Sequence, residues 1–262
     1  MHFIVKIFPE ITIKSPPVRK RFVKQLRQNL SVQLGNVDEN IKVKSDWDRI
    51  EVYCKAPTAV MVAETAAVLA NTPGIANFAK VQPFEMGDLE HIFQKTMSVW
   101  GESLAGKTFA VRVRRHGKHE LSSLEVERYV GGGLNMHAET GGVKLKNPDV
   151  TVRIEIKNDD IYVVEQQEPG LGGFPIGTQE PVLSLISGGF DSTVSSYLMI
   201  KRGMRTHYCF FNLGGAAHEA GLLPMRFSRP PHGAIAGLAL VEMNPMQPAS
   251  AAMRVKYIAV PK

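Results

Sequence analysis

Six consecutive residues in the second half of the chain are the best placed to do chemistry. They are Ser187, Gly188, Gly189, Phe190, Asp191 and Ser192. The two glycines allow the backbone to approach an anion closely, and the two serine hydroxyls can donate hydrogen bonds. Asp191 is the candidate catalytic residue, because its carboxylate could orient the loop or bind Mg²⁺ through water. The pattern predicts a phosphate-binding loop, although a Ser/Gly turn without a ligand is the simpler alternative.

The elements on either side support the phosphate interpretation. Residues 182–186 form a short apolar run typical of a buried strand, and residues 206–213 form a second one. Between them we expect a helix with Val194, Tyr197 and Leu198 on one face, closed by Gly203. A loop that opens such a helix exposes backbone N–H groups, and the helix dipole adds positive potential there. The loop lacks the Gly-Lys-Ser/Thr ending of a Walker A motif, so it belongs to another class.

Two stretches are basic and could contact the phosphates of RNA. The first, residues 14–27, holds cations with no acid among them, including Lys20 and Lys24. The second ends a predicted strand and enters its loop, with candidate RNA-binding residues Arg112, Arg114, Arg115 and Lys118. A solvated helix face and a polar hairpin loop are the alternatives that the sequence leaves open.

The sequence Ser-Gly-Gly-Phe-Asp-Ser resembles the SGGxDS loop of ATP pyrophosphatases, and its flanks narrow the resemblance. Residues 172–178 and 209–219 are similar to the tRNA 4-thiouridine sulfurtransferase family, which also serves thiazole synthesis for thiamine. Residues 3–14 and 126–135 are similar to the same family, so the likeness runs from residue 1 to about 221.

The resemblance implies an α+β N-terminal part followed by a partial α/β parallel-sheet ATP-pyrophosphatase domain. Residues 1–84 are expected to form a ferredoxin-like domain, since their pattern also predicts the order βαββαβ. Residues 85–167 would be a THUMP RNA-binding domain, 168–180 a linker, and 181–221 the partial pyrophosphatase domain. Because ligands of open α/β sheets bind at the carboxyl ends of strands, adenosine is expected beside four strand-end residues. These are Leu185, Ile186, Phe210 and Phe211.

The implied function is sulfur transfer to tRNA. ATP would adenylate O4 of a uridine, and a persulfide sulfur would displace AMP, with Mg²⁺ as the implied metal. The implied partners are tRNA, a persulfide donor of the cysteine desulfurase type and a sulfur carrier protein; homo-oligomerisation stays open. Two alternatives are a non-catalytic tRNA-binding fragment and a relative of GMP or NAD synthetases, against which the N-terminal half argues.

Composition sets further limits. The chain has 262 residues and a net charge of +6, of which residues 222–262 hold +4. The overall charge therefore does not argue for nucleic acid, and only the local stretches do. No apolar run reaches the ~18 residues of a membrane span, and the N-terminus has no apolar signal core, which favours the cytoplasm. Cys54 and Cys209 form no ligand array, so no metal site is predicted from cysteines.

The last 41 residues differ from the rest. They are rich in Pro, Ala and Met, and show no clear period of 2 or 3.6. We expect residues 222–262 to be a divergent, disordered tail that does not continue the domain, as after a frame shift. Apolar residues of the preceding strands, among them Leu183 and Leu185, would then be exposed.

Overall fold

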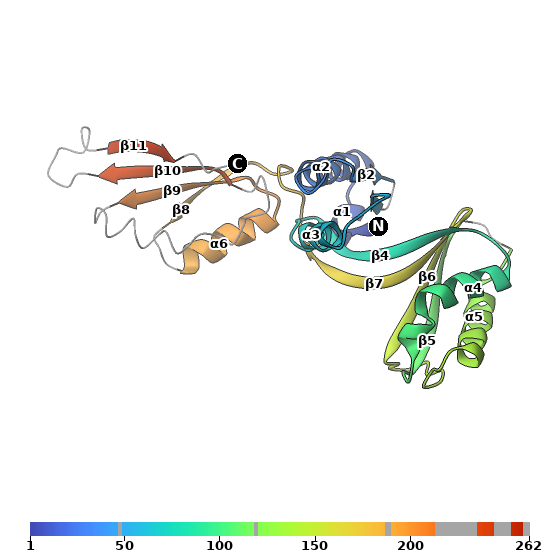
Figure 1. The fold of residues 1–262 in the computed structure, drawn as a ribbon. Helices are drawn as coiled ribbons and strands as arrows, with labels where there is room; N and C mark the ends of the chain where they lie inside the picture. The colour runs from blue at the N-terminus through green and yellow to red at the C-terminus, as the bar shows by residue number, and fades with distance from the viewer. Residues whose placement is uncertain (47–48, 118–119, 187–189, 213–234, 244–252, 259–262) are drawn as a thin grey trace. The chain divides into compact units, whose positions relative to one another are not determined.

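The computed structural model of the chain describes all residues except 47–48, 118–119, 187–189, 213–234, 244–252 and 259–262 (Figure 1). Two compact units are formed. The first comprises residues 1–4, 53–57 and 79–168, and the second residues 5–52, 58–78 and 169–262. Among the described residues, no helix is both long and apolar enough to cross a membrane.

A seven-stranded sheet has the strand order β2-β3-β1-β4-β7-β6-β5. Its strands are β1 (His2–Ile7), β2 (Lys42–Ser45), β3 (Arg49–Tyr53), β4 (Ile75–Glu85), β5 (Phe109–His116), β6 (Val150–Lys157) and β7 (Asp160–Gly172). The helices between them are α1 (Pro9–Thr12), α2 (Pro16–Gly35), α3 (Ala59–Ala70), α4 (Leu89–Trp100), η1 (Glu102–Leu104) and α5 (Ser123–His137).

The first four strands confirm the ferredoxin-like prediction. In chain order they read β1, α2, β2, β3, α3, β4, and their spatial order β2-β3-β1-β4 places the first and third strands in the middle. Helix α2 buries Phe22, Leu26 and Leu30, which recur every four residues and thereby predict a helix. Thr58 caps α3 by accepting a hydrogen bond from the backbone N–H of Met61.

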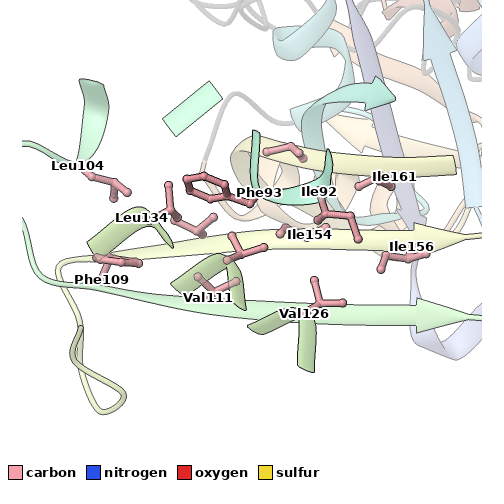
Figure 2. Close-up of a cluster of buried hydrophobic side chains, with 13 residues drawn as sticks. Ile92, Phe93, Leu104, Phe109, Val111, Val126, Leu134, Ile154, Ile156 and Ile161 are labelled. Atoms are coloured by element: carbon pink, nitrogen blue, oxygen red, sulfur yellow. The ribbon is translucent and has the colours of Figure 1, made fainter. Parts of the chain in front are cut away.

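In the first unit, α4 and α5 cover one face of β5 and β6 (Figures 1 and 2). The core between them gathers Phe93, Val111, Val126, Leu134 and Ile154, all nearly or fully buried. Strand β5 pairs parallel with β6, and β6 pairs antiparallel with β7. Asp88 caps α4 through His91 N at 2.8 Å, and Ser122 caps α5 through Glu125 N, as their positions before apolar-periodic segments predict.

Two sequence expectations need correction in these elements. Three consecutive glycines, residues 131–133, are typical of a helix break with positive φ. They do not break the helix here, because α5 continues through them to His137 and none of them has a positive φ. A Cβ on Gly133 would lie 2.6 Å from the Phe93 ring, so this glycine instead permits close helix packing. The expected linker is also partly wrong, since β7 extends to Gly172 and takes in its first residues.

The second sheet has the order β11-β10-β9-β8. Strands β8 (Val182–Ile186), β9 (Thr206–Asn212) and β10 (Ile235–Met243) are parallel, while β11 (Met253–Ile258) is antiparallel to β10. Helix α6 (Phe190–Lys201) connects β8 to β9, which confirms the predicted βαβ unit.

The expectation of a wholly disordered tail is wrong where β10 and β11 form. Strand β10 comes from the apolar run at 235–241, which has no period of two. The absence of a period of two therefore does not mean the absence of a strand.

Candidate functional site

The loop predicted to bind phosphate connects the carboxyl end of β8 to the first turn of α6. Ser187, Gly188 and Gly189 lie outside the described residues, so their predicted roles stay predictions. The structure does place the elements that hold them. The loop leaves a parallel strand at the edge where ligands of α/β sheets bind, and it enters a helix of 12 residues.

The first turn of α6 presents its polar groups to solvent. Asp191 is exposed there, and Phe190 is 85% exposed, so neither side chain is used in the core. The carbonyl oxygen of Ser192 accepts hydrogen bonds from the hydroxyls of Ser195 and Ser196, at 3.0 and 2.6 Å. A solvated carboxylate at this position is available to a ligand or to a metal bound by that ligand.

Serines, rather than the predicted apolar residues, hold α6 on the sheet. Ser196 is 1% exposed, and its hydroxyl lies 2.7 Å from that of Ser184 on β8. Val194, Tyr197 and Leu198, expected to form the packed face, are 55%, 45% and 52% exposed. The helix is turned so that Ser196 and Ile200, its two buried residues, face inward in place of the predicted three.

The structure brings together only some of the four residues expected around adenosine, which are Leu185, Ile186, Phe210 and Phe211. Leu185 and Ile186 are consecutive on β8 and therefore point to opposite faces of the sheet. Since Ser184 faces α6, Ile186 shares that face, while Leu185 lies on the other face and is 59% exposed. Ile186 pairs with Phe210 in the parallel register, and the side chains of Phe210 and Phe211 lie outside the description.

The segment that precedes β8 is fixed by several contacts. The Phe174 ring packs edge-on against Phe22 of α2, with centroids 5.6 Å apart, and its backbone N–H donates to the carbonyl of Lys201. The amide of Asn29 donates to the carbonyl of Ile176 at 3.0 Å. These contacts make Phe174 a packed anchor rather than a platform on which a base could stack.

Glycines make this anchor possible. Gly173 has φ of +75°, and a Cβ there would lie 2.0 Å from the carbonyl oxygen of Lys201. Gly203, the predicted helix stop after α6, has φ of +86°, and its carbonyl accepts from Gly177 N at 2.8 Å. The end of α6 is thus held by backbone contacts that a side chain would prevent.

The candidate RNA-binding residues fall into different environments. Arg114 is exposed on β5, and Lys20 and Lys24 are exposed on α2. Arg112 is exposed but donates one hydrogen bond to the carbonyl of Leu145, at 2.9 Å. Lys118 lies outside the described residues.

Arg115 has a structural environment. Its guanidinium donates to the Ser123 hydroxyl at 3.0 Å and to the carbonyl of Leu121, and it is half-buried. It therefore fastens the loop that precedes α5, and its side chain lies on the face of β5 opposite to Arg112 and Arg114.

Arg153 is a residue that the sequence reasoning missed. It is exposed on β6 and stands directly opposite Arg112 in the parallel register. The signal was present in the alternation of residues 152–157, in which Val152, Ile154 and Ile156 are buried. Without the register, however, the sequence did not connect Arg153 with β5.

Carboxylates in this unit have strong partners. Thr108 donates from both its backbone N–H and its hydroxyl to Asp149, at 2.9 and 2.6 Å, and thereby lowers the pKa of that carboxyl. The hydroxyl of Tyr129 donates to Glu90 at 2.9 Å, which raises the tyrosine pKa. Within the described part of the chain, no three His, Cys, Asp or Glu side chains are grouped to hold a metal ion.

Comparison with known proteins places each part of the chain. The model of the ThiI ferredoxin-like domain matches residues 2–79, that of the THUMP domain residues 87–164, and that of the thiamine biosynthesis protein (ThiI) residues 177–225. These matches follow the order of the elements described above.

Curated relatives are tRNA sulfurtransferases. That of Saccharophagus degradans is 54% identical over 227 residues, which are 87% of this chain and 47% of the relative. That of Klebsiella pneumoniae strain 342 is 57% identical over 222 residues, 85% of this chain and 46% of the relative. The chain therefore spans about half the length of these relatives.

Two solved structures are similar in fold. PH1313 from Pyrococcus horikoshii Ot3 superposes with a TM-score of 0.74 at 25% identity, covering 92% of this chain and 78% of that one. A 4-thiouridine synthetase in complex with RNA and bound ATP also superposes with a TM-score of 0.74, at 24% identity. The superposition covers 93% of this chain and 61% of the synthetase chain. At this low identity, the likeness to the 4-thiouridine synthetase shows only that the two folds are similar.

Proposed function

We propose that this chain, whose residues 2–79, 87–164 and 177–225 match models of the ThiI ferredoxin-like domain, the THUMP domain and ThiI, carries the tRNA-binding part and the pyrophosphate loop of an enzyme that replaces O4 of a tRNA uridine with sulfur. The observation that carries the proposal is the position of Asp191. It is exposed in the first turn of a helix that directly follows the carboxyl end of a parallel strand.

The proposed reaction activates a poor leaving group. O4 of the uridine attacks the α-phosphorus of ATP, and pyrophosphate leaves. The terminal sulfur of a persulfide, R–S–S⁻, then attacks C4, and AMP leaves with O4 in place of hydroxide, which gives a C4–S–S–R disulfide. A second thiol, also outside this chain, would attack the carrier sulfur of that disulfide, so that the thiouridine leaves as the thiolate and the two thiols are oxidised to a disulfide. The backbone N–H groups and hydroxyls of residues 187–192 would stabilise the charge that develops on pyrophosphate.

Asp191 fits the role of a metal-orienting carboxylate. Mg²⁺ is commonly held by one or two carboxylates together with substrate phosphates, so a single exposed aspartate beside the loop is compatible with it. When bound, Mg²⁺ would neutralise phosphate charge. Asp191 itself would accept hydrogen bonds from the metal's water ligands and fix their orientation.

The proposal also assigns partners. A persulfide donor of the cysteine desulfurase type, with or without a sulfur carrier protein, would supply the sulfur, and the reaction would take place in the cytoplasm. Cys209 is no candidate for the sulfur-carrying thiol, because it is buried within β9.

We expect two substitutions at the loop to abolish adenylation. Asp191→Asn removes the carboxylate charge, and Gly188→Val adds a branched side chain where the backbone must approach phosphate. The measurement is tRNA-dependent AMP release, made in a chimaera that joins residues 1–221 to the unmatched part of the Saccharophagus degradans relative. Ser195→Ala is the matched control, because that exposed hydroxyl bonds only within α6. Normal AMP release by Gly188→Val would exclude this loop as the phosphate site.

A second function, tRNA binding without catalysis, is favoured for the chain by one observation. Leu183 and Leu185, on the strand that leads to the loop, are 62% and 59% exposed, whereas the core of the first unit is fully enclosed. The two functions are separated by assaying the chain itself. Binding of tRNA without AMP release supports the second, and tRNA-dependent AMP release excludes it.

A further inference from the structure

The face of β5 and β6 that α4 and α5 leave uncovered carries three exposed arginines. Arg112 and Arg114 alternate on β5, and Arg153 lies on β6 opposite Arg112. The neighbouring residues Val111, Val152 and Ile154 point to the covered face, where they join the core shown in Figure 2. Alternation along the strands thus places the three guanidinium groups on one side of the sheet.

Their spacing suits a polyanion. Residues two apart on a strand are ~6.6 Å apart, and neighbouring strands are ~4.8 Å apart, so the three Cα atoms form a compact triangle. Glu155, half-buried and opposite Arg114, is the carboxylate that β5 and β6 contribute to this face within the described residues. Positive charge therefore exceeds negative charge there.

Protection of a sheet edge does not explain this arrangement. Cations often guard edge strands, and β5 is the outer strand of its sheet. Its edge is already occupied, however: Phe109 N donates to the carbonyl of Gly142, and Val113 N donates to the Glu127 carboxylate at 2.8 Å. Arg153 lies on the inner strand β6, where no edge exists to protect.

A contribution to the stability of the sheet does not explain the three arginines either. Like charges directly opposite one another across two strands destabilise a sheet. In the described part of the chain neither Arg114 nor Arg153 has an ion-pair or hydrogen-bond partner, and Arg112 bonds only to carbonyl oxygens. The pair of Arg112 and Arg153 is an arrangement that an external anion would stabilise.

We propose that Arg112, Arg114 and Arg153 form a phosphate-binding surface for the RNA backbone on the open face of β5 and β6. This inference rests on the proposed function. It refines that function, because Arg153 takes the place of Arg115 among the residues expected to bind RNA. Arginine suits this role because its planar fork can donate two hydrogen bonds to one phosphate. Arg112 keeps free donors, since it uses only part of its five N–H groups.

The test is the affinity of the whole chain for unmodified tRNA, measured by fluorescence anisotropy at several salt concentrations. Arg153→Gln should weaken binding about fivefold, the effect of losing one exposed ion pair. It should also reduce the slope of log K against log salt by about 0.7 to 0.9, as expected for one phosphate contact. The triple Gln variant of the surface should weaken binding on the order of a hundredfold if the contacts add.

Arg128→Gln is the matched control. Arg128 is exposed on α5, in the helical layer of the same unit, so its loss changes the net charge equally without touching the open face. We expect less than about a twofold change, since exposed charges away from the contact are screened. The urea midpoint of Arg153→Gln should be unchanged or raised, because the variant removes a like-charge pair.

Three outcomes separate the possibilities. If Arg153→Gln weakens binding no more than Arg128→Gln, the surface is wrong while the proposed function stands. A lowered urea midpoint for Arg153→Gln would assign this arginine a structural role instead. If the unsubstituted chain shows no salt-dependent binding of tRNA, the RNA-binding part of the proposed function fails, and the surface fails with it.

Discussion

At the scale of single residues, neighbouring glycines in one helix are expected to respond to substitution in opposite ways. Gly132→Ala should stabilise the chain by about 0.5–1 kcal/mol, since no atom lies within 4 Å of its added Cβ and alanine favours the helix. Gly133→Ala should be destabilising by ~1–3 kcal/mol, because its Cβ would collide with the buried Phe93 ring. Urea unfolding of both variants measures the difference, and equal effects would refute the packing role of Gly133.

Residues with local signals could be predicted, and residues defined by distant partners could not. Ser122 and Asp88 can be recognised as helix caps from the sequence, because each cap and its partner lie three residues apart. Arg153 was missed because its significance depends on Arg112, which is 41 positions away in the sequence and adjacent only in the sheet register. For the same reason Arg115 could not be separated from Arg114 until the two faces of β5 were known.

At the scale of elements, α5 begins with a capping box formed by Ser122 and Glu125. Because the Glu125 carboxylate is charged, the stability that the box adds depends on pH. Ser122 Oγ accepts from Glu125 N at 3.1 Å, and Glu125 accepts from Ser122 N at 2.7 Å. Ser122→Ala should be destabilising by about 1 kcal/mol. Ser98→Ala is the control, because that serine lies inside α4 and bonds only to the Lys95 carbonyl. Equal urea midpoints for the two variants would contradict the cap.

The pH dependence of this cap has a definite sign. Hydrogen bonds from the Ser122 hydroxyl and backbone lower the pKa of the Glu125 carboxyl below its usual value of 4.5. A lowered pKa in the folded state adds stability above the unfolded pKa and removes it as the pH falls through the folded pKa. The stability of the chain relative to Glu125→Gln should therefore be larger at about pH 7 than at about pH 3. An unchanged difference would show that ionisation of Glu125 does not contribute.

Element boundaries show where periodicity was a sufficient guide. Helices α2 and α4 lie where apolar spacing predicts them, because each buries one stripe of apolar residues. The continuation of α5 through three glycines could not be predicted, since Gly133 is required by the closeness of the Phe93 ring on α4 rather than by a backbone preference. Strand β10 was missed because its apolar run lacks the alternation used to recognise strands.

At the scale of the whole molecule, sequence segments and compact units do not coincide. The predicted boundary near residue 84 separates two patterns of elements, yet the first unit includes residues 1–4 and 53–57 together with 79–168. Long strands explain this difference: β4 has 11 residues and β7 has 13, so each can take part in more than one packed layer. A prediction from sequence patterns assigns each such strand to a single domain and therefore misses that it belongs to two units.

The last prediction concerns the sheet that carries the candidate ATP site. Leu183 and Leu185 lie on the face of β8 opposite α6, and both are more than half exposed. Leu183→Ser and Leu185→Ser should therefore change the free energy of unfolding by less than ~1 kcal/mol each, whereas Leu134→Ser, at a fully buried position, should cost ~2–5 kcal/mol. Both exposed-site variants should also reduce binding of an apolar fluorescent dye, because they remove accessible apolar surface. A loss of several kcal/mol at Leu183 or Leu185 would mean that this face is covered in solution, and a covered sheet would favour catalysis over tRNA binding alone.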